Sequence, residues 1–246
     1  MSLQGKVAVV TGAARGIGKA TSLRLAEEGA AVAVWDLDGP GAESVAEMIE
    51  ASGGRAIAIG ANAADASTIA SATARIRAEL GPITVLVNNA GISAFDSFLD
   101  ISEELWERVQ SINLKGPFLC SQAIVPDMLE AGWGRIVNIS SSSAQTGAPW
   151  MAHYAVSKGG VIGLTKALAM ELAAQGVTVN HVPPGFVDTP MLRDSPVDVD
   201  EHALTTPMKR AGRPEDIAAA VAYLVSDGAG YVTGQTISVN GGRYLV

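Results

Sequence analysis

Tyr154 and Lys158 are the two residues whose chemical types and spacing first indicate a reaction. If residues 152–175 form one helix, side chains four positions apart lie on the same face, so the phenol and the ammonium group can share one cavity. A free phenol has a pKa of about 10 and is a poor base at neutral pH, but a neighbouring cation favours the phenolate. The spacing therefore predicts a proton-transferring pair in which Lys158 lowers the pKa of Tyr154. Taken alone, such a pair is more often an ordinary polar contact on a helix surface.

Ser141 follows residues 135–139, an apolar run that is typical of a buried strand with a polar tip. Its hydroxyl could hold a substrate oxygen beside the phenol of Tyr154. Hydride transfer forms or consumes an alkoxide, so it needs one group of tuned pKa and a second hydrogen-bond donor. Tyr154 and Ser141 are of the types that this chemistry requires.

A glycine-rich turn, residues 11–18, connects a short apolar strand at 6–11 to a helix at 19–29. Its glycines let the backbone approach a pyrophosphate, and the helix N-terminus offers unpaired N–H groups and the positive end of a dipole. The next strand, 30–36, ends in Asp36, a position from which a carboxylate binds both ribose hydroxyls and repels a 2′-phosphate. This favours NAD(H) over NADP(H), although Arg15 in the turn could face a 2′-phosphate.

Strands and helices alternate along the rest of the chain. We expect further strands at 55–60, 83–88, 134–140, 177–182 and 235–239, and further helices at 40–52, 66–80 and 102–131. This alternation predicts an α/β fold: a single Rossmann-type, doubly wound parallel sheet of about seven strands with helices on both faces. We expect one domain over residues 1–246, with a mobile lid at about 189–210, where proline and acidic residues are frequent.

Composition argues against several other classes of protein. The chain is 48% hydrophobic and 17% charged, with a net charge of −8 and no basic cluster, so nucleic acid and anionic membranes are unfavourable partners. No apolar run is long enough to span a bilayer and no signal-peptide pattern is present, which predicts a cytoplasmic protein. Cys120 is the single cysteine, and His153, His181 and His202 lack metal-ligand spacing, so we expect no disulfide and no metal.

Taken together, these motifs resemble the short-chain dehydrogenase/reductase family, single-domain type, over essentially the full length. The matching residues are Thr11-Gly12-x-x-x-Gly16-Ile17-Gly18, Asn88-Asn89-Ala90-Gly91, Asn113, Ser141, Tyr154-x-x-x-Lys158, Asn180 and Pro184-Gly185. The resemblance implies a catalytic tetrad. In it Tyr154 is the acid/base, Lys158 lowers its pKa and holds the nicotinamide ribose, Ser141 orients the substrate oxygen, and Asn113 keeps a water for proton relay. Without the family, Asn113 would be interpreted as a helix residue bonded to backbone.

The resemblance also implies a set of cofactor contacts, to which Tyr154 and Lys158 belong. The remaining members are Gly12, Arg15, Gly16, Ile17 and Gly18 at the pyrophosphate and nearby ribose, Asp36 and Leu37 at the adenosine ribose, Asn89, Ala90 and Gly91 at the strand ends, and Pro184, Gly185, Val187 and Thr189 near the carboxamide. One departure is visible, because Asn62 and Ala63 stand where relatives usually place an aspartate near the adenine. The amide oxygen of Asn62 could still accept from the adenine amino group.

Variable segments around the motifs should form the substrate pocket. The candidates are Ser93, Ser141, Gln145, Thr146, Trp150, His153, Phe186, Met191 and Leu192. They predict a mid-sized, largely apolar alcohol or ketone. Trp150 could equally serve core packing, and His153, next to the catalytic tyrosine, more often points away from such a site.

Three glycines, Gly159, Gly160 and Gly163, fall within the catalytic helix, where each costs roughly 1 kcal/mol relative to alanine. Something must therefore approach this helix closely. The resemblance implies a homo-oligomer assembled through it, with a tetramer expected, and the apolar C-terminal residues 241–246 could pack on a neighbouring subunit.

The leading prediction is an NAD(H)-dependent oxidoreductase that acts on a secondary alcohol or ketone. The chain also resembles NADPH-dependent 3-oxoacyl carrier-protein reductases, but residues 127–132 and 173–176 lack the bases with which that group binds its acidic carrier. A third possibility is a nucleotide-sensing protein that kept the fold and lost the chemistry. A missing tetrad residue would support that possibility, and none is missing.

Overall fold

The computed structural model describes residues 2–245, so Met1 and Val246, the two ends of the predicted domain, lie outside the described residues. A six-stranded sheet has the order β3-β2-β1-β4-β5-β6, and every pair of neighbours is parallel. The strands are β1 (Val7–Thr11), β2 (Ala31–Asp36), β3 (Arg55–Gly60), β4 (Val85–Asn88), β5 (Gly134–Ile139) and β6 (Val177–Val182). The chain leaves β1 in one direction and returns to its other side with β4, so a crevice opens at the carboxyl ends of these two strands.

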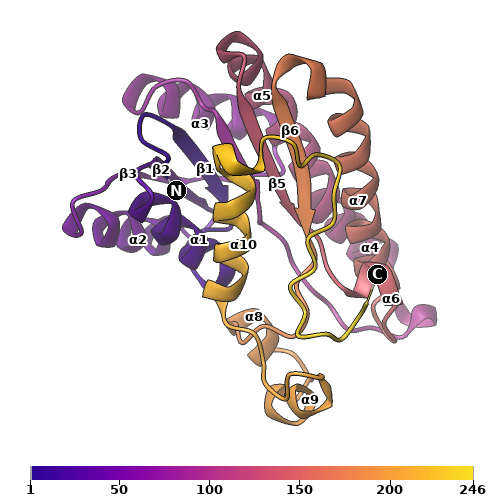
Figure 1. Cartoon of the computed structure of the whole chain (residues 1–246). Coiled ribbons are helices and arrows are strands. Elements are labelled where there is room, and N and C mark those ends of the chain that lie inside the picture. The colour runs from indigo at the N-terminus through magenta and orange to yellow at the C-terminus, as the bar shows by residue number, and fades with distance from the viewer. Residues whose placement is uncertain (1, 246) are drawn as a thin grey trace.

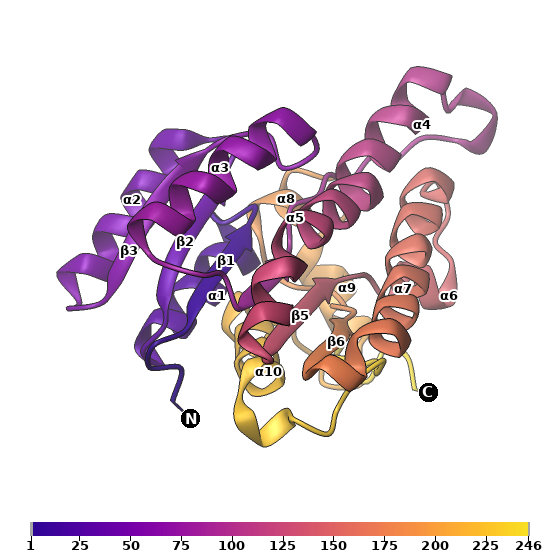
Figure 2. The same cartoon turned by 90° about the horizontal axis from the view of Figure 1, so that it is seen from above.

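Helices cover both faces of this sheet (Figures 1 and 2). One apolar core joins the strands to α1 (Gly16–Glu27), α2 (Gly39–Ala51) and α10 (Pro214–Val225). The other joins them to α3 (Ala66–Glu79), α5 (Gly116–Ala131) and α7 (Ala152–Leu172). Along β1, Ala8 and Val10 face the first core while Val7 and Val9 face the second, which explains why the buried strands have continuous apolar sequences. The predicted doubly wound α/β fold is confirmed.

The remaining helices lie around the carboxyl edge of the sheet or beyond it. They are α4 (Glu103–Gln110), α6 (Ser143–Thr146), α8 (Pro190–Arg193) and α9 (Val199–Thr205). The segment predicted as a lid, 189–210, contains α8 and α9, and α9 projects away from the sheet (Figure 1).

The sheet has six strands rather than about seven, because residues 235–239 make only isolated parallel bridges, His181 to Thr236 and Pro184 to Val239. His181 N donates to Gln235 O, and Ile237 N donates to His181 O. The next rung would need an N–H group at position 183, which is a proline. Pairing resumes where Gly185 N donates to Val239 O.

The predicted helix over 102–131 is interrupted in the middle. A π-helical turn, Ser111–Lys115, separates α4 from α5, and Asn113 lies within it. Such turns insert one residue into the helical repeat and frequently occur at functional sites. The turn aims the Asn113 side chain into the protein, where it is fully buried.

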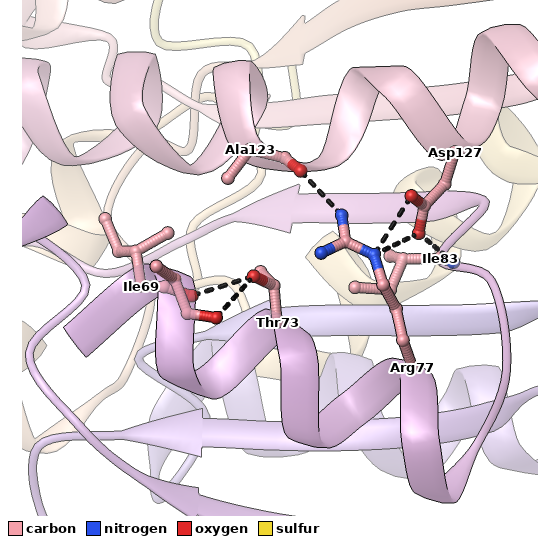
Figure 3. A network of polar contacts seen from close by, with 7 residues as sticks. Ile69, Thr73, Arg77, Ile83, Ala123 and Asp127 are labelled. Carbon is pink, nitrogen blue, oxygen red and sulfur yellow. Dashed lines mark hydrogen bonds and ion pairs between the residues drawn. The ribbon is translucent and has the colours of Figure 1, made fainter. Parts of the chain in front are cut away.

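A polar clamp fastens α3 to α5 and to the segment that enters β4 (Figure 3). Arg77 Nε donates to Asp127 Oδ1 and Oδ2 at 3.0 and 2.9 Å, and Arg77 Nη2 donates to Ala123 O at 2.7 Å. Asp127 Oδ2 also accepts from Ile83 N at 2.9 Å. The Asp127 carboxylate therefore joins three segments, and its side chain is only 13% exposed.

We predict that Asp127→Ala lowers the free energy of unfolding by about 1–3 kcal/mol, because Arg77 and the Ile83 N–H group both lose their acceptor. Chemical denaturation measures the change. Glu79→Ala is the matched control, since it removes an exposed ion pair with Arg75 and should cost less than about 1 kcal/mol. Equal losses in the two variants would show that the clamp is only a surface contact.

The His181 side chain, on β6, bonds to Ser140, which follows β5, and to Thr236 in the segment on the other side of β6. Ser140 Oγ lies 2.7 Å from His181 Nδ1, and Thr236 Oγ1 lies 2.7 Å from Nε2. The ring is fully buried, and burial, with a smaller contribution from Lys166, lowers the pKa of His181 to about 4. The ring is therefore neutral at physiological pH.

We predict that stability falls as the pH drops from about 6.5 towards 4. In this window the unfolded chain, with a histidine pKa of about 6.5, binds a proton that the folded protein does not, a difference of up to about 3 kcal/mol. Thermal unfolding midpoints across this range test the prediction. His181→Asn should flatten the pH profile whereas the control His202→Asn should not, and an unchanged profile in His181→Asn would contradict this origin.

Candidate active site

Two adjoining cavities occupy the crevice at the carboxyl ends of the strands. The first, here called the tyrosine cavity, is lined by Ser141, Tyr154 and Lys158, together with Pro184 and Gly185. The second, here called the glycine-loop cavity, is lined by the following predicted cofactor residues: Gly12, Arg15, Gly16, Ile17, Asp36, Leu37, Asn62, Ala63, Asn89, Ala90, Gly91 and Thr189. Residues common to both linings, namely Ile17, Asn89, Gly91, Thr189 and Met191, make the cavities one continuous cleft. Val187 lines the tyrosine cavity.

The glycine loop packs tightly on the end of β4. Gly12 has a φ of +65°, and a Cβ atom there would lie 2.7 Å from Ala90 Cα. Asn89 Nδ2 donates to Thr11 O and Gly12 O at 2.9 and 2.8 Å, while the Thr11 hydroxyl accepts from the backbone N–H groups of Asn89 and Ala90. A Cβ atom at Gly18 would lie 2.1 Å from Gly12 O, so only glycine allows the loop to pack against the start of α1 here. Gly18 itself lines neither cavity.

The start of α1 can receive an anion. Its N-cap residue, Arg15, supplies no side-chain acceptor, and the first turn has no acidic residue. Gly16 and Ile17, which begin the helix, line the glycine-loop cavity. Free N–H groups and the positive end of the helix dipole at this position fit a pyrophosphate group.

Asp36 is held at the end of β2 by two backbone donors. Ala14 N donates to Asp36 Oδ2 at 2.9 Å, and Asp38 N donates to Oδ1 at 3.0 Å. Each carboxylate oxygen keeps a further lone pair for ribose hydroxyls. Asn62 Oδ1, predicted to accept from the adenine amino group, already accepts from Ala64 N at 2.9 Å, so its position is set by a local turn.

The electrostatics of Tyr154 differ from the prediction. Lys158 Nζ donates to Ile139 O at 2.9 Å and lies 5.9 Å from the centre of the Tyr154 ring. Burial lowers the pKa of Lys158 to about 8. Burial also raises the pKa of Tyr154, against a smaller lowering from the Ser141 hydroxyl. The expected depression of the phenol pKa is therefore absent, because desolvation outweighs its neighbours and the ammonium group is directed at a backbone carbonyl.

Asn113 ties the loop after β4 to α7. Its Oδ1 accepts from Ile92 N at 2.8 Å, and its Nδ2 donates to Ile92 O and to Ser157 Oγ at 2.9 and 3.1 Å. A Cβ atom at Gly91 would lie 3.2 Å from Asn113 Oδ1 and 3.3 Å from Lys158 Nζ, so only glycine allows this approach comfortably. Both Nδ2 hydrogens of Asn113 are therefore used within the protein, so a relay water could bind Asn113 only at an acceptor, either the second lone pair of Oδ1 or the backbone carbonyl.

The predicted substrate residues divide into two groups. Ser93, Ser141, Met191 and Leu192 line the tyrosine cavity. Gln145, Thr146, Trp150, His153 and Phe186 do not. Trp150 is 66% exposed with a φ of +60°. His153 is fully buried, and its Nε2 lies 3.9 Å from Asp96 Oδ2. Phe186 packs instead against His202 and Arg243.

Seven residues of the tyrosine cavity were not predicted from the sequence, namely Phe95, Ile139, Ser140, Ser142, Ser143, Met151 and Arg243. Ser142, Ser143 and Met151 are close in sequence to the motif residues, and this proximity was an available signal. Arg243 had no such signal, because only tertiary folding brings the C-terminal segment to the catalytic residues.

Two expected absences concern only the part of the chain that the structure describes. Within residues 2–245, no three His, Cys, Asp or Glu side chains gather closely enough to hold a metal ion. No helix in the same range has the length and apolar character needed to cross a membrane. Cys120 is buried, and burial raises the pKa of its thiol to about 12, so it is a poor nucleophile.

Comparison with known proteins agrees with this architecture. The sequence profile of a family described as "Enoyl-(Acyl carrier protein) reductase" matches residues 12–243. The protein named 3-oxoacyl-[acyl-carrier-protein] reductase FabG is 46% identical in Staphylococcus aureus over 98% of both chains, and 42% identical in Thermotoga maritima over 100% of both. The Pseudomonas aeruginosa protein of the same name is 41% identical over 100% of both chains.

The chain therefore belongs to the short-chain dehydrogenase/reductase family, whose members are oxidoreductases that act on carbonyl or hydroxyl groups with a nicotinamide cofactor. The glycine loop, the open start of α1 and Asp36 fit such a cofactor by their shape and donor chemistry.

Proposed function

We propose that the protein transfers hydride between a nicotinamide cofactor and C3 of a 3-oxoacyl or 3-hydroxyacyl thioester. The observation that carries this proposal is the meeting of Ser141, Tyr154 and Lys158 in one cavity that is continuous with the glycine loop. The relatives that share 41–46% of its residues from end to end are named 3-oxoacyl-[acyl-carrier-protein] reductases, and their name supports this class of substrate.

The bound nicotinamide would supply the hydride. In our proposal the N–H groups of Gly16 and Ile17 bind the pyrophosphate and Asp36 binds the adenosine ribose. The remaining predicted cofactor residues in the cleft shape the pocket around them. We also propose that residues 189–210 act as a lid, since Met191 of α8 lines both cavities.

Tyr154 is the proposed proton donor to the reacting oxygen, and the Ser141 hydroxyl donates a second hydrogen bond to the same oxygen. Burial raises the pKa of Tyr154, which keeps the phenol protonated at neutral pH. A protonated phenol can donate to the alkoxide that forms when a ketone is reduced, whereas oxidation of an alcohol requires the phenolate. This protonation state favours reduction.

A second candidate is an NAD(H)-dependent oxidoreductase of free secondary alcohols and ketones. Residues 127–132 and 173–176 carry no base. Of the arginines that contact them, Arg77 is paired with Asp127, and Arg135, which donates to Gly176 O, is buried. An acidic carrier protein would find no free cation there. Initial rates with an acyl-carrier thioester, the matching coenzyme A thioester and free ketones, each with both reduced cofactors, decide between the two. Reduction of free ketones alone would eliminate the thioester proposal.

We predict that Tyr154→Phe lowers kcat by about 10²-fold or more, because the variant loses the proton-donating oxygen and little else. Cofactor affinity, measured by fluorescence titration, should change little. Tyr223→Phe, at a partly exposed tyrosine on α10, is the matched control and should keep full activity. Turnover by Tyr154→Phe above about a tenth of the wild-type rate would remove Tyr154 from its proposed role.

We further propose that NAD(H) is preferred over NADP(H). The carboxylate of Asp36 is fixed in the glycine-loop cavity, and a 2′-phosphate would bring about two negative charges close to it. Arg15 lines the same cavity but is exposed, where such a charge contact contributes about 1 kcal/mol or less. Repulsion by Asp36 should dominate.

We predict that kcat/KM is at least about tenfold higher with NAD(H) than with NADP(H), a difference of about 1.4 kcal/mol in activation free energy. Asp36→Asn should shrink this ratio while it keeps an acceptor for the Ala14 N–H group. Asp36→Ala should shrink the ratio too and also loosen the loop. Equal use of both cofactors by the wild type, or a ratio that neither substitution changes, would show that Asp36 does not lie beside the adenosine ribose.

We also propose the homo-oligomer, with a tetramer expected. Gly160 is explained within the chain, because a Cβ atom there would lie 2.6 Å from Leu114. Gly159 and Gly163 have no atom within 4 Å of such a Cβ, and Val156 and Met170 of the same helix are exposed. A second copy packed on α7 would explain both the open glycines and the exposed apolar side chains.

A further inference from the structure

The tyrosine cavity has a charge opposite to that of the protein. Of the described residues that line it, Lys158 and Arg243 carry positive charge and none carries a carboxylate. The whole chain has 25 acidic and 17 Lys or Arg residues, with a net charge of −8. A cavity that is lined by two cations and no carboxylate, in a chain of net negative charge, favours an anionic ligand.

Of these two cations, Arg243 has free donors. Lys158 is buried and donates to Ile139 O. No ion pair or side-chain hydrogen bond joins Arg243 to any other residue in the range 2–245, and its guanidinium lies 4.0 Å from the centre of the Phe186 ring. Stacking on an aromatic ring orients the plane of a guanidinium and leaves its N–H groups at the edge.

Two arginines in the segment between β6 and α10 are paired with acidic residues. Arg193 Nε lies 2.6 Å from Asp188 Oδ1, and Arg210 Nη1 lies 2.9 Å from Asp216 Oδ2. Both charges are thus neutralised locally. Arg243 has no such acid, although the surrounding segments contain several.

The position of Arg243 is set by a turn at Asn240. Gly242 N donates to Asn240 Oδ1, Asn240 Nδ2 donates to Tyr244 O, and Arg243 N donates to Asn240 O, at 2.9, 2.9 and 3.2 Å. Asn240 in turn packs on Gly185 of the cleft, where a Cβ atom would lie 2.8 Å from Asn240 Cα. The turn therefore holds Arg243 at the solvent-facing edge of the cavity.

We propose that Arg243 determines substrate specificity by binding an anionic oxygen group on the carboxyl side of the reacting ketone. A guanidinium presents paired N–H donors that suit both carboxylate and phosphate oxygens. The group is either the carboxylate of a free 3-oxo acid or a phosphate on the pantetheine arm of a thioester. This inference rests on the proposed 3-oxoacyl reduction and specifies which substrates that site accepts.

Steady-state kinetics with three ketones test this proposal: acetoacetate, its neutral methyl ester and acetoacetyl-coenzyme A. Arg243→Met keeps an unbranched side chain over Phe186 and removes the charge. We expect it to raise KM for an anionic ketone by about tenfold or more, the scale of one lost charge-assisted contact, with kcat within about threefold and the ester unaffected. An effect on acetoacetate alone identifies the carboxylate, and an effect on the coenzyme A thioester alone identifies the phosphate.

Two further variants complete the comparison. Arg243→Lys keeps the positive charge but lacks the paired N–H donors of a guanidinium, so its affinity for the anionic ketones should lie between those of Arg243→Met and the wild type. Arg108→Met removes one exposed positive charge on α4, outside both cavities, and should change none of the three KM values. An equal change for the ester and the anions, a change only in the KM for the nicotinamide cofactor, or no change at all would overturn the proposal.

Binding measurements separate this inference from the proposed reaction. Calorimetric titration of acetoacetate and of acetoacetyl-coenzyme A into the cofactor-loaded Tyr154→Phe protein needs no turnover. If the Tyr154→Phe/Arg243→Met double variant no longer binds the anions, the contact between Arg243 and the anion is supported. This holds even if the wild type reduces none of the three ketones, a result that would refute the 3-oxoacyl proposal but not the anion contact. Failure of both anions to bind when Arg243 is present would refute the anion contact.

Discussion

The close approach of the glycine loop to the end of β4 is the constraint on which the rest of the site depends. Gly12 lies so near Ala90 that no side chain fits between them, and the Thr11 hydroxyl and the Asn89 amide hold the two segments together. The strand order reverses between β1 and β4, so this seam lies at the bottom of the cleft. Both cavities border it, and any loosening there would displace the cofactor site relative to Tyr154.

Burial gives the two cavities different electrostatic characters. In the glycine-loop cavity Asp36 is fixed by two backbone donors and presents negative charge. In the tyrosine cavity desolvation raises the pKa of Tyr154 and lowers that of Lys158 to about 8, while Arg243 retains its charge at the edge. According to our proposals, one cavity therefore repels an additional phosphate on the cofactor, whereas the other accepts an anionic substrate. The proposed reaction and specificity both depend on this separation of charge within one cleft.

Much of the fold could be predicted because its determinants are local. Buried parallel strands have continuous apolar sequences, and both ends of six predicted strands lie within about two residues of their observed positions. Two predicted elements, the strand at 235–239 and the helix at 102–131, differ from the observed structure, and each difference arises from one residue or one helical turn. Pro183 removes one N–H group and reduces the predicted strand at 235–239 to isolated bridges, and a π-helical turn at Ser111–Lys115 divides the predicted helix at 102–131.

The sequence by itself determined the contacts that lie within one element or one turn: Tyr154 and Lys158 on one helix, the glycine loop before α1, and Asp36 at a strand end. Helical and strand periodicities are properties of the backbone, so spacing alone is enough to place such groups. Only the tertiary structure decided that Trp150 and His153 lie outside the cavity, that Arg243 enters it, and that Tyr154 has a raised pKa. These outcomes depend on which face of each element is buried and on how much water the packing excludes, and residue spacing specifies neither.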